Sequence, residues 1–293
     1  MDLTKYGLWT VALDLQPAPE ARAAAAEIES LGYGAIWLPE AVNREAMANS
    51  MLLLGATERI CIATGIANLH ARTAMSMSAG HKTITSAYPD RFLLGIGVSH
   101  QVAVEHLLGR EYSKPLTTMK NYLETMDSAL YFAAPPPVEP QRVLAALGPK
   151  MLELARERTA GAHPYFVPIE HTPVARDILG AGKLLCPEQA VVLETDPATA
   201  RAVARAHMAT YLGLPNYTNN LRRLGWGDDD LGAGGSDALV DAIVAWGSTD
   251  EIVKRIDAHH DAGADHVAIQ VLTAEPRALP MAQWRELASA LGL

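Results

Sequence analysis

Short apolar runs alternate with longer amphipathic segments along the whole chain. The runs are rich in Ile, Val and Leu, which is typical of strands buried on both faces of a parallel sheet. The segments between them have the length and the Ala- and Leu-rich composition of helices. The predicted strands are residues 6–10, 35–38, 60–66, 92–96, 142–146, 161–167, 189–193 and 266–272.

The helical pattern fills the intervals between these strands. The predicted helices are residues 20–31, 44–56, 73–88, 101–108, 120–132, 149–158, 170–179, 197–212, 237–246, 249–262 and 281–291. Eight strands that alternate with helices predict an α/β protein, a single (β/α)8 TIM-barrel domain over residues 1–293. A doubly wound open sheet is the alternative, but no GxGxxG follows the first strand, and Gly95-Ile96-Gly97 lacks the third glycine.

Residues 211–247 interrupt this alternation after the seventh strand. Most of the stretch reads as irregular, is rich in Gly, Asn and Asp, and carries Tyr217, Trp226 and Trp246. It is longer than a usual barrel loop, so we predict an insertion that acts as a lid over a substrate. An additional packing subdomain or a dimer contact would explain the same composition.

Composition narrows the classes of partner. The chain has 293 residues, of which 49% are hydrophobic, and a formal net charge of −9. No block of Lys or Arg stands out, which argues against nucleic acid or an anionic membrane as the main partner. No apolar run reaches the length of a membrane span, and the first residues do not read as a signal peptide. The two cysteines, Cys61 and Cys186, form no CxxC, so we expect a reducing cytoplasm.

Small and polar residues follow two neighbouring strands within residues 59–100. Gly65, Asn68 and His70 come at or after the end of the third strand. Gly97, Ser99 and His100 come at or after the end of the fourth strand. Ligands of parallel α/β folds bind at the carboxyl ends of strands, so both loops should open onto one site.

Two further polar residues end predicted strands and have more than one interpretation. Glu40 follows the second strand and could be a base or a hydrogen-bond acceptor, or simply a helix N-terminal acid or ion-pair partner. His100 has the side chain best suited to move a proton near neutral pH, although a lone histidine can equally be structural. Asn43 reads as a helix cap, and Arg72 as an anion ligand or a surface residue.

A possible anion site lies later in the chain. Gly148-Pro149 opens a predicted helix and leaves free backbone N–H groups at its start. His163 could line the same site or merely pack. Neither an HExxH zinc motif nor a GxSxG nucleophile elbow is present, and we predict no metal site.

At this point several motifs together resemble the luciferase-like monooxygenase superfamily, in particular its actinobacterial branch of oxidoreductases that use the deazaflavin coenzyme F420. The motifs are LGYGAIWLPEAV (31–42), ATGIANLHAR (63–72), YPDRFLLGIGVSH (88–100), LAALGPKMLELA (144–155), GLPNYTNN (213–220) and AGADHVAIQVL (262–272).

The resemblance implies a TIM barrel that forms a homodimer. It implies a non-proline cis peptide at Gly65-Ile66, behind the deazaflavin ring, and a cofactor phosphate on backbone N–H groups near Gly148. It places Glu40 at a cofactor contact and His100 at a proton-handling position. The expected cofactor-binding residues are Glu40, Gly65, Ile66, Asn68, Gly97, Ser99, Gly148, Pro149 and His163, and the expected catalytic residues are His100 and Glu40.

The function that the resemblance implies is hydride transfer between F420 and a small organic substrate. Deazaflavins react poorly with oxygen, which favours reduction or dehydrogenation over oxygenation. An FMN-dependent monooxygenase and a non-catalytic deazaflavin-binding protein are the alternatives. The neutral to acidic, aromatic rim favours an uncharged or apolar substrate over a phosphate ester.

Overall fold

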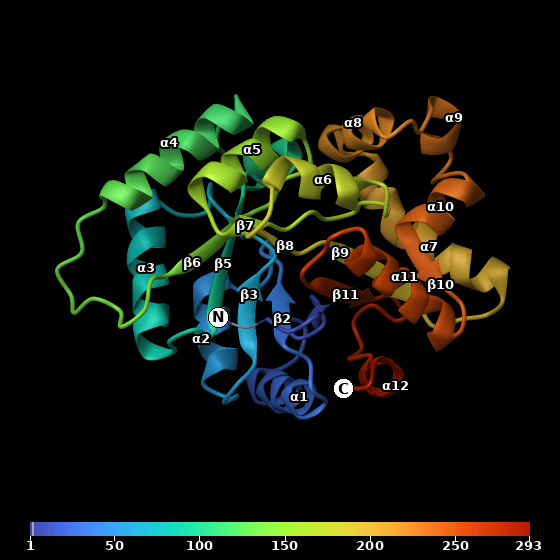
Figure 1. Cartoon of the computed structure of the whole chain (residues 1–293), viewed down its shortest axis with the longest axis horizontal. Coiled ribbons are helices and arrows are strands. Elements are labelled where there is room, and N and C mark those ends of the chain that lie inside the picture. Colours follow the sequence, from blue (N-terminus) through green and yellow to red (C-terminus); the bar gives the residue numbers. More distant parts are fainter. Residues whose placement is uncertain (2) are drawn as a thin grey trace.

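A ring of parallel strands forms the centre of the molecule, and helices surround it (Figure 1). The computed structural model describes residue 1 and residues 3–293. The strands are β1 (Tyr6–Trp9), β2 (Ala35–Leu38), β3 (Cys61–Thr64), β4 (Ala67–Asn68), β5 (Phe92–Gly97), β6 (Gln141–Leu144), β7 (Gly161–Ala162), β8 (Leu184–Leu185), β9 (Glu188–Val192), β10 (Val244–Trp246) and β11 (Val267–Val271). Their order is β10-β9-β11-β1-β2-β3-β5-β6-β7-β8, and β4 pairs with β5.

The ring closes through residues 184–192. Only Cys186 and Pro187 separate β8 from β9, and hydrogen bonds continue across them. The N–H of Cys186 donates to the carbonyl of Ala162, and that of Ala268 donates to the carbonyl of Pro187, both at 2.9 Å. The stretch therefore pairs with β7 at its start and with β11 at its end, and β11 pairs with β1. The predicted TIM-barrel fold is confirmed.

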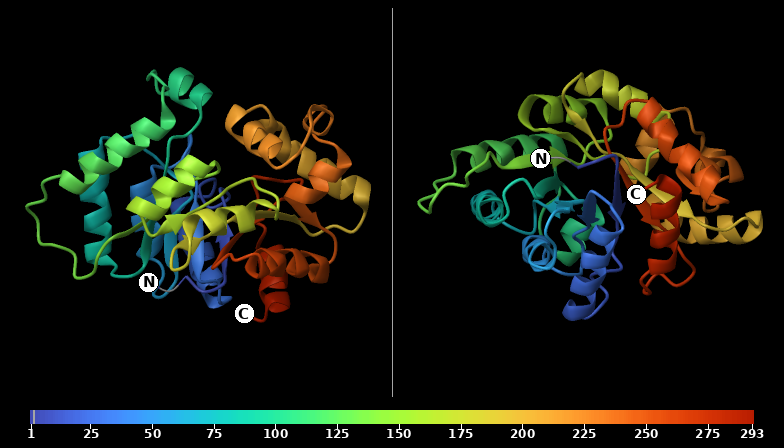
Figure 2. Two further views of the ribbon diagram at one scale, coloured as in Figure 1. Left: turned by 45° about the horizontal axis from the view of Figure 1, so that its top comes forward. Right: turned by 60° about the horizontal axis from the view of Figure 1, so that its bottom comes forward.

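Twelve α-helices and one π-helix accompany the strands in the described residues. They are α1 (Ala18–Ser30), α2 (Ala46–Leu54), α3 (Ala74–Ala87), η1 (Ala103–Leu107), α4 (Pro115–Ser128), α5 (Pro149–Arg158), α6 (His171–Leu179), α7 (Pro197–Leu212), α8 (Pro215–Arg223), α9 (Asp228–Leu231), α10 (Asp237–Ile243), α11 (Thr249–Asp261) and α12 (Met281–Leu291). Helices α8 and α9 stand at one end of the molecule, and α1, α12 and both termini lie at the other (Figures 1 and 2).

Alternate residues of each strand face the two sides of the sheet. The interior cluster contains Leu3, Trp9, Ala35, Trp37, Cys61, Ala63, Leu93, Val143, Cys186 and Ala268. The intervening residues, such as Leu8, Ile36 and Ile62, pack outward against the helices in the largest hydrophobic cluster. Both faces are apolar, which is why the strands read as continuous apolar runs in the sequence.

Three predictions about the elements were wrong. Residues 213–236 are not irregular, because α8 and α9 lie within them. The helix predicted over residues 237–246 ends at Ile243, and β10 follows directly, since its β-branched and aromatic residues pair with β9. The strand predicted over residues 161–167 ends at Ala162, as β7. The helix predicted over residues 101–108 is present, and Ala103–Leu107 within it form a π-helix.

The stretch from α7 to β10 has a hydrophobic cluster of its own. Ala204 and Met208 of α7, Leu221 of α8 and Val240 of α10 pack together with Val192 of β9. The insertion is thus anchored on the barrel strands by apolar contacts. No helix in the described residues is both long enough and apolar enough to cross a membrane.

One carboxyl group lies inside the barrel. Glu188 on β9 pairs in register with Ala268 of the interior cluster and is 2% exposed. Its Oε2 accepts the backbone N–H of Phe166 at 3.1 Å, whereas Oε1 has no hydrogen-bond partner among the described residues. Burial raises the pKa of Glu188 from 4.5 to about 8, so the side chain is a neutral acid at neutral pH.

The buried acid predicts a loss of stability as the pH rises. A folded-state pKa above the unfolded value means that the folded chain holds the proton more tightly, so stability falls between the two values, here from pH 4.5 to about 8. Between pH 6.5 and 8 the wild type should lose about 2 kcal/mol that Glu188→Gln retains. Urea unfolding at several pH values measures the difference.

The matched control is Glu286→Gln on the exposed face of α12, which should follow the wild type at every pH. Parallel pH curves for Glu188→Gln and the wild type would contradict the assignment of a neutral Glu188.

Candidate active site

The loop that follows β3 forms a bulge at the mouth of the barrel. The peptide bond between Gly65 and Ile66 is cis, as the family resemblance predicts. After it, β4 resumes the pairing with the neighbouring strand, with Ala67 opposite Ile96 and Asn68 opposite Gly97. The bulge thus lies between β3 and the end of β5.

Glycines make room for this bulge. A Cβ on Gly97 would lie 2.5 Å from Cδ1 of Ile66, so the Ile66 side chain packs directly over the backbone of Gly97. A Cβ on Gly65 would lie 2.8 Å from Nε1 of Trp9 and 3.0 Å from Nε2 of His163. The rings that approach Gly65 from the barrel interior therefore belong to the protein itself.

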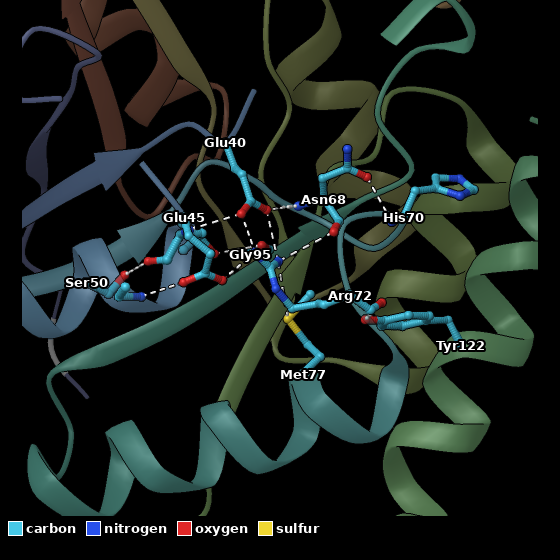
Figure 3. Close-up of polar contacts among 12 residues, drawn as sticks. Glu40, Glu45, Ser50, Asn68, His70, Arg72, Met77, Gly95 and Tyr122 are labelled. Carbon is cyan, nitrogen blue, oxygen red and sulfur yellow. Dashed lines mark hydrogen bonds and ion pairs between the residues drawn. The ribbon is translucent and has the colours of Figure 1, made fainter. Parts of the chain in front are cut away.

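The carboxylate of Glu40 holds the bulge in place (Figure 3). Its Oε2 accepts the backbone N–H of Asn68 at 2.8 Å, and its Oε1 accepts that of Ala46, the first residue of α2, at 3.0 Å. Arg72 donates to both oxygens, and the two side chains are only 7% and 9% exposed. Glu40 thus ties β2, α2 and β4 together.

These contacts match the structural interpretation of Glu40 from the sequence. The carboxylate is saturated by donors and is both a helix N-terminal acid and an ion-pair partner. Arg72 is held by Glu40 and by Glu45, whose Oε1 lies 2.5 Å from its Nη2. Asn43 does not cap α2, because Glu45 is the N-cap and accepts the N–H of Ala48 at 2.7 Å. We expect Glu40 to act on a ligand through the bulge.

His163 lies beneath the bulge in the barrel interior. Its Nδ1–H donates to the carbonyl of Cys186 at 2.7 Å, and the ring stacks on Trp37 with centroids 4.2 Å apart. Burial lowers the pKa of His163 to about 4, so the ring is neutral and Nε2 carries a lone pair. This Nε2 is buried without a partner in the described structure and faces Gly65. His163 therefore lies at the bulge and not at the predicted anion site.

His100 lies at the mouth, after β5. Ser99, the residue before it, has φ 57°, a left-handed conformation that non-glycine residues adopt rarely. Burial lowers the pKa of His100, while a hydrogen bond from the ring to Asn216 of α8 raises it in part. Nδ1 of His100 is buried and has no partner in the described part of the chain. Nδ1 of His100 is thus left for a ligand.

Aromatic side chains join the insertion to the barrel. Tyr217 of α8 packs on His100 with centroids 5.4 Å apart, and on Phe166 at 5.3 Å. The Tyr165 hydroxyl makes hydrogen bonds with the Tyr211 hydroxyl at 2.8 Å and with Oε1 of Gln270 at 2.9 Å. Tyr217 of the insertion therefore lies against residues at the mouth. Trp246 lies away from it, on β10, with its Nε1–H donating to Asp241 at 2.7 Å.

Gly148 and Pro149 lie at the N-terminus of α5, as predicted. A Cβ on Gly148 would lie 3.0 Å from Nη1 of Arg223, so α8 places a guanidinium beside this helix end. No ion pair joins Arg223 to another described residue, and its side chain is exposed. The positive end of a helix dipole and a cation therefore meet at one point, which is an arrangement suited to an anion.

The sequence analysis missed Trp9, Tyr165, Glu188 and Arg223. Trp9 lies in a predicted strand, and only the alternation along that strand could have shown that it faces the interior. Tyr165 lies in the strand predicted over residues 161–167, but β7 ends at Ala162, so no strand period applies to it. Glu188 stands one residue before the predicted strand at 189–193. Arg223 lay in a stretch interpreted as irregular, and nothing in its neighbours indicates that α8 lies across α5.

Comparisons with known proteins show similar chains with the same fold. A Mycobacterium tuberculosis (strain ATCC 25618 / H37Rv) protein to which coenzyme F420-dependent oxidoreductase activity is ascribed is 23% identical over 333 residues, covering 92% of this chain and 96% of the relative. An F420-dependent secondary alcohol dehydrogenase, solved with an F420–acetone adduct, superposes with a TM-score of 0.77 at 13% identity, over 99% of this chain and 98% of its own.

A further similar structure contains FMN. It is the oxygenating constituent of 3,6-diketocamphane monooxygenase from the CAM plasmid of Pseudomonas putida, a type II Baeyer–Villiger monooxygenase. It superposes with a TM-score of 0.67 at 14% identity, over 97% of this chain and 96% of its own. The sequence model of the luciferase-like monooxygenase family matches residues 3–266. The chain therefore belongs to the luciferase-like monooxygenase family.

Proposed function

We propose that this protein is an oxidoreductase that uses coenzyme F420 to transfer a hydride to or from a small organic substrate. The observation that carries the proposal is the meeting of the cis Gly65-Ile66 bulge and the free Nδ1 of His100 at one mouth of the barrel. The family membership and the F420-dependent relative support it.

The residues at the mouth fit such a cofactor. The bulge offers a backbone surface that Glu40 and Arg72 hold rigid, and rigid positioning is what a reacting ring needs. The N-terminus of α5 and the guanidinium of Arg223 suit an anionic tail. We assign the ring to Gly65, Ile66, Asn68, Gly97 and Ser99, and the tail to Gly148, Pro149 and Arg223. When bound, the deazaflavin supplies or accepts the hydride.

His100 is the proposed proton donor or acceptor. Burial lowers its pKa, which leaves the ring neutral at neutral pH, and Asn216 of α8 offsets this shift only in part. The unpartnered Nδ1 can then take a proton from a substrate hydroxyl, or return it to a carbonyl oxygen. Glu40 keeps the bulge in register beside it, in a positioning role.

The FMN-containing neighbour supports a second candidate, a flavin-dependent monooxygenase. A cytoplasmic location, which the cysteine content favours, and a homodimer, which the family resemblance implies, complete the proposal.

Cofactor titration tests the central proposal. We expect F420 to bind with a Kd below roughly 10 µM, and FMN to bind at least about tenfold more weakly. Quenching of cofactor fluorescence measures both. Tight uptake of FMN with indifference to F420, together with oxygen consumption in the presence of reduced FMN, would establish the monooxygenase instead. Saturable F420 binding without turnover of any acceptor would indicate a binding protein.

Substitution of His100 tests the proton step. His100→Ala should lower turnover about a hundredfold with the best acceptor from a panel of small organic compounds, because proton transfer is lost. The activity of the wild type should fall at acidic pH as the neutral ring becomes protonated, whereas the activity of the variant should not show this fall. F420 affinity should change less than about threefold. His106→Ala on the exposed face of η1 is the control. Intact turnover of His100→Ala at every pH would remove the role.

Substitution of Arg223 tests the tail site. Arg223→Gln should raise the Kd for F420 roughly fivefold, since an exposed charge-assisted contact contributes about 1 kcal/mol. The difference should shrink in high salt. Arg222→Gln removes the same charge from the neighbouring residue, whose guanidinium pairs with Asp228 at 2.8 Å, and should leave the Kd unchanged. Equal effects of the two variants would refute a specific site.

A further inference from the structure

A chamber of about 670 Å³ opens beside the bulge, between α7 and the carboxyl ends of three strands. One wall is the face of α7 that carries Ala202, Ala206 and Tyr211. The opposite wall contains Thr10 after β1, Pro39 after β2 and Gln270 of β11. The strands meet α7 here because the insertion packs its own hydrophobic cluster onto β9 and β10.

The chamber adjoins the proposed cofactor surface. Trp9 lines it, and the indole N–H of Trp9 donates to the carbonyl of Gly65 at 3.0 Å. Trp9 therefore contacts both the chamber and the bulge. A compound held in the chamber would lie next to a ring placed on Gly65 and Ile66.

The lining is almost free of charge. Among the described residues that line the chamber there is no Asp, Glu, Lys or Arg, and alanine, valine and proline dominate. The one histidine, His207, is neutral at neutral pH, because burial lowers its pKa to about 4. Burying a charged ligand against such walls would leave the charge unpaired, which is costly.

Polar groups gather at one end of the chamber. Tyr211 and Gln270 line it and are linked through the hydroxyl of Tyr165, at 2.8 and 2.9 Å. His207 packs on Tyr211 with centroids 4.9 Å apart, and its buried Nε2 has no partner among the described residues. This end can satisfy one hydrogen-bonding group of an otherwise apolar ligand.

We propose that this chamber is the substrate site and that it takes an uncharged, mainly apolar compound with a hydroxyl or carbonyl group besides the one that reacts. This inference rests on the proposed oxidoreductase function, which it extends by naming the substrate class. The apolar part of the compound lies against α7, the non-reacting oxygen meets His207, Tyr211 and Gln270, and the reacting group lies toward the bulge and His100.

Two dyes of similar shape, one uncharged and one anionic, test the chamber without F420. The uncharged N-phenyl-1-naphthylamine should bind with fluorescence enhancement, at least about tenfold more tightly than the anionic 1-anilinonaphthalene-8-sulfonate. Equal affinity for the two dyes, or no binding of the uncharged one, would overturn the proposal.

Variants on α7 place the dye in the chamber. Ala206→Trp fills it from the lining face and should lower the affinity for the uncharged dye more than tenfold. Ala209→Trp adds the same side chain on the exposed part of the same helix outside the lining, and should bind like the wild type. Unchanged dye binding by Ala206→Trp would refute the location.

The polar end has its own test. The wild type should bind 1-naphthol about fivefold or more tightly than naphthalene, because the hydroxyl finds a partner. His207→Phe keeps a ring of similar size without nitrogen, so it should reduce the ratio of the affinities for 1-naphthol and naphthalene. Equal preference in the wild type and the variant would remove His207 from the site.

Cofactor binding separates this proposal from the proposed function. Ala206→Trp should keep the F420 affinity of the wild type within about twofold while losing turnover of uncharged acceptors. Failure of the wild type to bind F420 while the uncharged dye still binds would overturn the function and leave the apolar site. Turnover of charged acceptors that is as fast as turnover of uncharged ones would overturn the substrate class alone.

Discussion

The carboxylate of Glu40 is the interaction on which the mouth of the barrel depends. It stands after β2 and receives N–H groups from α2 and β4 together with the guanidinium of Arg72. Removing one partner of a buried ion pair leaves the other charge uncompensated, so loss of either Glu40 or Arg72 would destabilise the whole network. The cis bulge, and the Gly97 backbone under Ile66, are held in register from this single point.

An asymmetry inside the ring explains where space is left for ligands. Large rings enter from β1, from β2 and from the end of β7, as Trp9, Trp37 and His163. They lie beside small residues such as Ala63 of β3 and Gly65, which follows it. The deep interior is therefore filled, as in other TIM barrels. Ligands can be held only above these rings, where the strand ends, the bulge and α7 meet.

The sequence predicted this architecture well where one period dominates. Buried strands such as β5 and the helix α3 follow from uninterrupted apolar and amphipathic patterns, and the cis peptide followed from the family resemblance. Residues 244–246 could not be assigned to β10, because an apolar stretch beside a helix fits either state until the pairing with β9 is known. Contacts between distant segments leave no local pattern at all. The saturation of Glu40, the neutral Glu188 and the place of Arg223 beside Gly148 each depend on them.

The stretch from α7 to β10 serves several surfaces at once. Helix α7 forms a wall of the apolar chamber, Asn216 and Tyr217 of α8 contact His100, and Arg223 lies at the start of α5. The stretch packs largely on itself and on β9. The stretch from α7 to β10 can therefore be exchanged as one unit when related genes recombine. Exchange of the stretch at its two ends would transfer three features in one step: the α7 wall of the chamber, the α8 residues beside His100, and Arg223. The remaining barrel strands would keep their register.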